Sequence, residues 1–110
     1  LLAAGAQVDD VGYGGMTPLM EAARTGQEEI LRLLLSRGAS IEAVDDSGRT
    51  ALIWAALAGH ENTVRALLES GADPQARDDS GRGAASYAAL FNRKQVLALL
   101  RKQNKQEIQK

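Results

Sequence analysis

The sequence is poor in the residues that most often carry chemistry, with no cysteine, one histidine and four aromatic side chains in 110 residues. Without cysteine it has no disulfide, no thiolate zinc site and no cysteine nucleophile. No apolar run approaches the roughly 18 residues of a membrane-spanning helix, and the opening LLAAGAQVDD lacks the basic region of a signal peptide. With 45% hydrophobic and 25% charged residues and a net charge of −1, the composition is that of an ordinary soluble domain.

A 33-residue period organises what is present. Shifting the chain by this period superposes Gly15, Gly48 and Gly81, together with an alanine pair that follows each glycine and, in the first two units, a leucine pair that follows the alanine pair. We refer to the resulting segments as the tail of a truncated unit and the first, second and third unit: residues 1–11, 12–44, 45–77 and 78–110. A period of this size predicts an array of stacked supersecondary units, with further units expected upstream because the truncated tail has no polar cap.

Each unit predicts a pair of short helices. In the first unit, Thr17 is placed as an N-cap in front of a helix over Pro18–Thr25, and Gly26 ends that helix in a left-handed conformation. A second helix is predicted over 28–37, where apolar residues recur on one face, and Gly38 ends it. Both helices are shorter than the roughly 12–15 residues needed for stability alone in water, so we expect them to depend on stacking.

The third unit departs from this plan. Asn92 and Asn104 stand at the two glycine stop positions, Gly83 replaces the threonine cap, Ala85 replaces the buried leucine of the first helix, and Arg101 replaces the second leucine of the pair. Because Asn tolerates the left-handed conformation, we expect the turn geometry to be kept at both positions. Residues 1–77 carry 11 acidic and 6 basic side chains, whereas residues 78–110 carry 3 acidic and 7 basic ones. The polar, basic end predicts a degenerate C-terminal capping unit.

The segments 15–19 (GMTPL) and 48–52 (GRTAL), each followed by an alanine pair, a glycine and a leucine pair, resemble the ankyrin repeat. That family has a 33-residue period and a T-P-L-H-x-A signature; here Met20, Ile53 and Ser86 replace its histidine. The resemblance covers residues 1–110 and implies an all-α solenoid of helix–turn–helix units with β-turn fingers. It further implies a non-catalytic, cytoplasmic protein-binding platform that needs no cofactor.

The resemblance also implies where a partner protein binds. Contacts are expected at the tips of the fingers and along the concave face of the first helices. The finger positions are Tyr13, Gly14, Met16, Asp46, Ser47, Arg49, Asp79, Ser80 and Arg82, and the helix positions are Glu21, Arg24, Trp54, Leu57, Tyr87 and Leu90. We expect Trp54 and Tyr87 to lie along one exposed stripe and to anchor the partner, since such rings dominate binding energy. The alternatives are solvated turns and rings that pack against neighbouring helices.

Other candidate sites have plainer interpretations. His60, the only histidine, follows Gly59 as in the ankyrin family, where this histidine is structural; no second histidine is available for a metal site. The acidic pairs, Asp9-Asp10, Asp45-Asp46 and Asp78-Asp79, are expected to close turns because the calcium-loop pattern does not follow them.

The remaining candidate is a basic cluster near the C-terminus, made of Arg93, Lys94, Arg101, Lys102, Lys105 and Lys110. We interpret it as a solvated cap and not as a nucleic-acid or anionic-lipid site, because only one aromatic residue lies near it and the whole chain is slightly acidic. The sequence therefore predicts a protein–protein interaction module without a small-molecule substrate, nucleic-acid partner, bound metal or membrane insertion. The rival prediction is a regulatory or structural segment of a larger enzyme, channel or effector protein.

Overall fold

The computed structural model describes the backbone of residues 8–108 and the side chains of residues 8–103. Within that range the chain is helical and contains no strand; one isolated antiparallel bridge joins Arg77 to Gly83. The elements in order are η1 (Tyr13–Gly15), α1 (Pro18–Thr25), α2 (Glu28–Ser36), α3 (Ala51–Ala58), α4 (Glu61–Glu69), α5 (Ala84–Leu90) and α6 (Lys94–Ile108). The predicted all-α fold is confirmed. The predicted match of the first seven residues to the end of a preceding unit lies outside the described residues.

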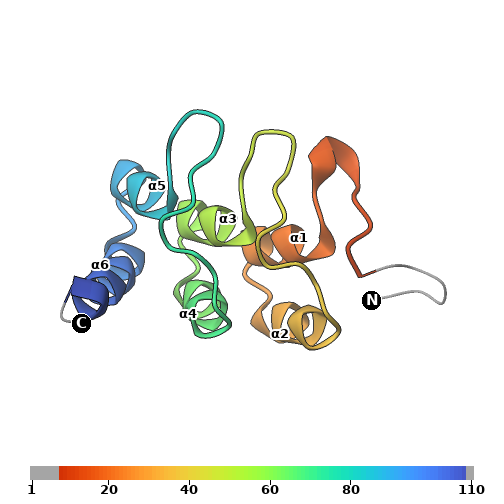
Figure 1. Cartoon of the computed structure of the whole chain (residues 1–110), viewed down its shortest axis with the longest axis horizontal. Coiled ribbons are helices and arrows are strands. Elements are labelled where there is room, and N and C mark those ends of the chain that lie inside the picture. The colour runs from red at the N-terminus through yellow and green to blue at the C-terminus, as the bar shows by residue number, and fades with distance from the viewer. Residues whose placement is uncertain (1–7, 109–110) are drawn as a thin grey trace.

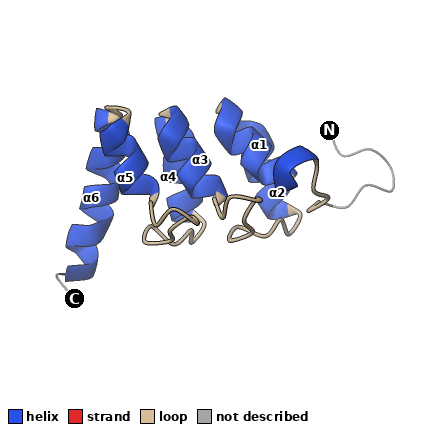
Figure 2. Ribbon diagram, turned by 90° about the horizontal axis from the view of Figure 1, so that it is seen from above, coloured by secondary structure: helices blue, strands red, loops and turns tan. Residues whose placement is uncertain are grey.

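The helices form two parallel rows. One row contains α1, α3 and α5, and the other contains α2, α4 and α6, with each helix contacting the next one in its row and its partner in the same unit. Figures 1 and 2 show the three pairs side by side, with the connecting loops projecting as fingers on one side. The resulting body measures 44 × 26 × 22 Å. These contacts confirm that the short helices are stacked.

The helix termini follow the predicted capping pattern in the first two units. The hydroxyls of Thr17 and Thr50 accept hydrogen bonds of 3.2 Å from the backbone N–H groups of Met20 and Ile53. Gly83, at the same position of the third unit, provides no side-chain cap.

The predicted turn geometry holds at one asparagine and fails at the other. Asn92 has a φ of 59°, the left-handed value expected in place of glycine. The prediction for Asn104 is wrong, because this residue lies inside α6, which continues to Ile108. The surrounding lysines, glutamines and glutamate favour helix, so without a glycine the chain has no reason to stop there.

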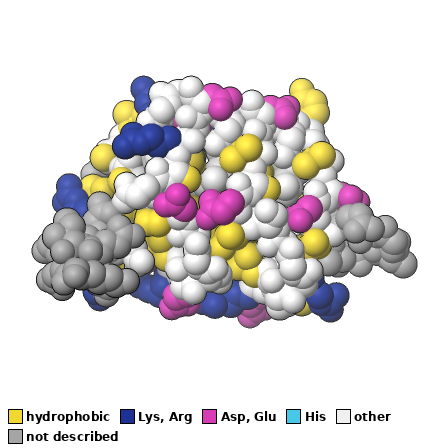
Figure 3. Space-filling view, in the orientation of Figure 1, with side chains coloured by type: hydrophobic (Ala, Val, Ile, Leu, Met, Phe, Trp, Pro, Cys, Tyr) yellow, Lys and Arg dark blue, Asp and Glu magenta, His cyan; other side chains and the backbone are white. Residues whose placement is uncertain are grey.

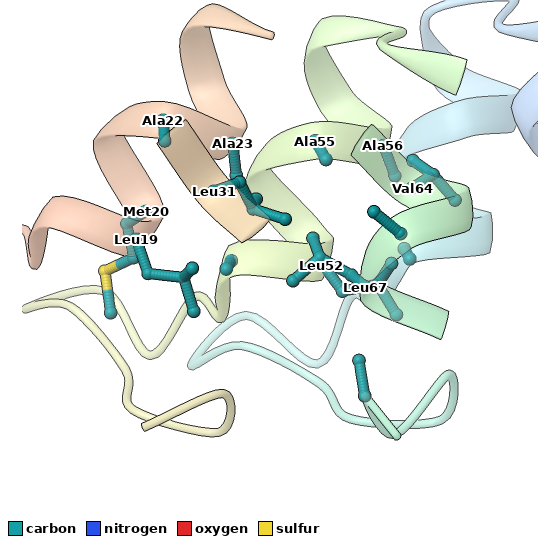
Figure 4. Packing of buried hydrophobic residues seen from close by; sticks show 14 of the residues in the cluster. Leu19, Met20, Ala22, Ala23, Leu31, Leu52, Ala55, Ala56, Val64 and Leu67 are labelled. Atoms are coloured by element: carbon teal, nitrogen blue, oxygen red, sulfur yellow. The ribbon is translucent and has the colours of Figure 1, made fainter. Parts of the chain in front are cut away.

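Alanine and leucine side chains fill the space between the rows (Figure 4). Ala23 and Ala56 are fully buried, which lets adjacent units approach closely, while Leu31 and Leu67 fill the gap between the two rows. Ala85, at the register position of the buried Leu52, is exposed. That exposure supports the predicted capping role of the third unit, which stays a prediction.

The three fingers, numbered in chain order, include residues 12–16, 45–49 and 78–82, and they are joined to one another through the backbone. The N–H of Asp46 donates to the carbonyl of Gly14, and the N–H of Asp79 donates to the carbonyl of Ser47, both at 3.0 Å. Within the second finger, one carboxylate oxygen of Asp45 accepts from the N–H of Ser47 at 2.8 Å, which confirms the predicted aspartate turn. Neighbouring fingers therefore form a continuous rim above α1, α3 and α5.

Candidate functional site

A groove of about 430 Å³ lies between the first two fingers and the helices beneath them. Its lining comes from the first finger, α1, the second finger and α3: Tyr13, Gly14, Met16, Glu21, Arg24, Asp45, Asp46, Ser47, Arg49 and Trp54. Nine of the fifteen positions predicted to contact a partner line this groove; those outside it are Leu57, Asp79, Ser80, Arg82, Tyr87 and Leu90. The predicted contacts are thus concentrated between the first and second units.

Trp54 is anchored at the floor of this groove by a buried carboxylate. Its indole Nε1–H donates to Asp45 Oδ2 at 2.9 Å. The other oxygen of Asp45 accepts from the backbone N–H groups of Ser47 and Arg49 at 2.8 and 3.0 Å. Because the acceptor is itself held by the finger, Trp54 fixes the finger to α3 while part of its side chain stays exposed.

The third unit repeats this arrangement with tyrosine in place of tryptophan. The hydroxyl of Tyr87 donates to Asp78 Oδ2, and Oδ1 accepts from the N–H and hydroxyl of Ser80 and from the N–H of Arg82. Burial of Asp78 opposes its ionisation, but these hydrogen bonds outweigh burial and hold the pKa of Asp78 well below its ordinary value. Asp78 is therefore a fixed negative charge inside the fold at neutral pH.

Arg49 reaches from the second finger into the interval between the second and third units. Its guanidinium carbon lies 4.9 Å from the ring centroid of Trp54 and 5.4 Å from that of Tyr87, so the cation sits against both rings. Its Nε is 3.6 Å from Asp78 Oδ2, and Nη2 donates to the hydroxyl of Tyr87 at 3.4 Å. The same cation therefore links α3, α5 and the third finger.

The predicted exposed aromatic stripe is wrong for Tyr87. Its side chain is only 4% exposed, because the hydroxyl is directed inward to Asp78 while Arg49 covers the ring. The alternative of packing against neighbouring elements describes it correctly. Trp54 combines both interpretations, since its N–H bonds inward while the side chain still lines the groove.

The other predicted contact residues vary in exposure. Tyr13 is fully exposed at 100%, and Leu90 is 60% exposed, whereas Leu57 is partly buried. Asp79 and Arg82 are exposed on the third finger. In Figure 3, acidic side chains lie along the finger tips and across the middle of the face, while basic ones gather along its lower edge and toward the C-terminal end.

A family model for ankyrin repeats in three copies matches residues 1–78 and again residues 42–110. The chain belongs to the ankyrin repeat family. Ankyrin repeats are generally protein–protein interaction modules and are typically non-catalytic. No curated protein shows a significant match to the chain. In the part of the chain that the structure describes, no helix is long and apolar enough to cross a membrane.

His60 has a structural position in this ankyrin array. Its Nε2 donates to the carbonyl of Arg24 at 3.0 Å, and its ring packs against Gly26, where a Cβ would lie 2.7 Å from Nδ1. Arg93, one period later, donates from Nε to the carbonyl of Leu57 at 3.1 Å. Both side chains therefore connect one unit to the preceding one. Arg93 has this structural contact and is not simply a solvated residue of the predicted basic cluster. Among the described residues, no group of three or more histidine, aspartate or glutamate side chains is placed so that it could hold a metal ion.

The connection between the buried aspartates and the aromatic rings was missed in the sequence. Asp45 and Asp78 were predicted only to close turns, and Arg49 was predicted as a finger residue that contacts the partner. A signal was present, because Asp45 and Trp54 have the same nine-residue spacing as Asp78 and Tyr87. The nine-residue spacing alone does not show that the ring donates a hydrogen bond to the aspartate of the same unit. That contact depends on how the finger folds over the helix.

Proposed function

We propose that this ankyrin-repeat chain acts by binding a partner protein through the groove between its first two fingers. The single observation that carries this proposal is the anchored but partly exposed Trp54 in a groove of about 430 Å³. Its indole is held in place by Asp45 and by the stacked Arg49 before any partner arrives. A preformed aromatic contact loses little conformational freedom on binding and is the kind of residue that dominates interface energy.

The rim of the groove supports the same proposal. Tyr13 stands free above it, and Asp46 and Ser47 form the opposite wall. These side chains offer an aromatic surface, a charge and a hydroxyl on neighbouring fingers that are joined by backbone hydrogen bonds. A partner would therefore meet a rigid rim. We further predict that the chain has no catalytic activity, is located in the cytoplasm and does not bind nucleic acid.

The test uses exposed rim residues, because substitution of Trp54 would also remove its bond to Asp45. Partners captured from an extract should be compared between the unmodified chain and the double variant Tyr13→Ala/Asp46→Ala. We expect capture to fall at least about tenfold, the loss typical of removing an interface hot spot, with an unchanged melting temperature. The control is Glu29→Ala/Arg65→Ala, which alters exposed positions on α2 and α4. Equal losses in both variants, or none in the first, would contradict the proposed groove.

A further inference from the structure

The first interval lies between the first and second units, and the second interval lies between the second and third units. Both have the same backbone hydrogen bond between adjacent fingers, but their side chains differ. In the second interval, between the second and third units, Arg49 places its guanidinium against the Tyr87 ring and beside Asp78. One period earlier, in the first interval, the residue at the position of Arg49 is Met16. The other components are retained, with Trp54 in place of Tyr87 and Asp45 in place of Asp78. The first interval therefore has an aromatic ring and a carboxylate but receives no cation from the preceding finger.

The position of the missing cation is open to a ligand. Met16, Trp54 and Asp45 all line the groove of about 430 Å³. Glu21 also lines it, at the register position that Trp54 has in the second interval. Where Arg49 has a second ring beside it, a cation in the first interval would have a carboxylate, which attracts it more strongly.

The charges of the lining favour a cation over an anion. Glu21, Asp45 and Asp46 supply three carboxylates, against two guanidinium groups from Arg24 and Arg49. Arg49 already lies beside Asp78, and its Nε is buried without a hydrogen bond, so its charge is directed into the second interval. Arg24 pairs with Glu21, but both side chains are about half exposed, so this pair is weak and easily exchanged.

We propose that the first interval binds an arginine side chain of the partner protein, with the guanidinium against Trp54 and beside Asp45 and Glu21. This proposal rests on the proposed function and specifies the chemistry of the partner. Arginine is favoured over lysine because its planar, weakly hydrated guanidinium stacks on rings, as that of Arg49 does in the neighbouring interval.

Trp54 is the only tryptophan of the chain, so its fluorescence reports directly on this site. The probes are acetylated and amidated Gly-Ser-Arg-Ser-Gly peptides, together with versions carrying lysine, glutamate or citrulline at the central position. Citrulline has nearly the shape of arginine without its charge. We expect the arginine peptide to bind about fivefold to tenfold more tightly than the citrulline peptide, with lysine between them and glutamate weakest. Equal binding of arginine and citrulline, or no binding of arginine, would overturn the proposal.

Substitutions in the groove give a second test. Met16→Arg should place a guanidinium of the chain itself in the first interval and weaken binding of the arginine peptide about tenfold. Met16→Leu should leave binding unchanged. Glu21→Gln should weaken binding and Arg24→Gln should strengthen it. Glu69→Gln is the control with the same charge change, since Glu69 contacts Arg32 on the other row of helices. If Glu69→Gln weakened binding of the arginine peptide as much as Glu21→Gln, the peptide would be responding to the overall charge of the chain, and the proposed site would be wrong.

The two proposals fail in different ways. If the Tyr13→Ala/Asp46→Ala variant loses its partner while the arginine and citrulline peptides bind equally, the chain binds protein through the groove without an arginine contact. If the arginine peptide binds as expected but partner capture does not depend on the rim residues, the first interval binds arginine and the proposed function of the groove is wrong.

Discussion

The two intervals between units are equal in backbone and unequal in side chains. In both, an N–H of one finger donates to a carbonyl of the preceding finger at 3.0 Å. Both intervals have an aromatic ring bonded to an aspartate, but only the second adds a partly exposed cation, Arg49, that links three elements. The first interval has Met16 in place of the cation and opens into a groove. The same repeated backbone arrangement therefore holds a cation that links the units in the second interval, and in the first it leaves the groove where we propose that a partner binds.

The largest expected effect comes from forcing the fingers apart in the second interval. Gly48 has a φ of 80°, and a Cβ there would lie 2.4 Å from Asp79 Oδ1 and 2.9 Å from the Asp79 nitrogen. We expect Gly48→Ala to lower the free energy of unfolding by about 2–3 kcal/mol, since backbone strain adds to a displaced hydrogen bond. Denaturant titration measures this loss.

The matched control is Gly81→Ala. Gly81 has a φ of 84°, but a Cβ there would meet no atom within 4 Å. It should lose only about 1 kcal/mol, from backbone strain alone. Equal losses at Gly48 and Gly81 would show that contact between the fingers contributes nothing to stability.

Asp78 provides the second test, through pH. At neutral pH, Asp78→Asn should lower the free energy of unfolding by about 1–3 kcal/mol, because an amide cannot accept all the hydrogen bonds from Ser80, Arg82 and Tyr87. The pKa of Asp78 is lowered in the folded state from its ordinary value of 3.8. Its contribution is therefore complete above that value and is lost as the pH falls below it.

Unfolding free energies measured from neutral to acidic pH check this prediction. The decline at low pH should be shallower in Asp78→Asn than in the unmodified chain. Asp45→Asn should lose less at neutral pH, because among the described residues Asp45 receives no hydroxyl bond from a serine and forms no salt bridge. A larger loss of unfolding free energy in Asp45→Asn than in Asp78→Asn would show that the aspartate of the first interval contributes more to stability, contrary to this prediction.

The smallest of these effects is expected for Arg49→Met, which copies the first interval into the second. It removes the cation from between Trp54 and Tyr87, and we expect a loss of about 1 kcal/mol, since cation–π contacts and an ion pair at a partly exposed site each contribute little. Arg82→Met makes the same change one period later, on an exposed finger, and should alter stability by less than about 0.5 kcal/mol. Thermal and denaturant unfolding compare the two; a loss at Arg82 equal to that at Arg49 would contradict the role of the stacked cation.

Much of the fold was predictable because its signals are local. The bounds of α1 agree with the predicted Pro18–Thr25, and Thr17 and Gly26 act as the predicted cap and stop. These residues act through their own backbone and the neighbouring turn, so their effect can be assessed from the sequence beside them. Asn104 was predicted wrongly because the same residue type stops one helix and continues another, according to the residues that follow it.

The candidate site was predicted only in part. The resemblance to ankyrin repeats placed Tyr13, Met16 and Asp46 on the fingers, where they line the groove, but it treated Trp54 and Tyr87 as equivalent. The structure separates them, since Arg49 covers Tyr87 and leaves Trp54 at the groove. This difference arises between units, from a residue 38 positions away in the chain.

By itself, the sequence determined the period, the helix pairs, the threonine caps of the first two units and the family, because each follows from a local, repeated pattern. Only the tertiary structure decided which ring is buried, that the pKa of Asp78 is lowered and which interval stays open. Burial, hydrogen bonding and the pKa of a carboxylate depend on the atoms that surround a group. In a stacked array those atoms belong to the neighbouring unit as much as to the residue's own.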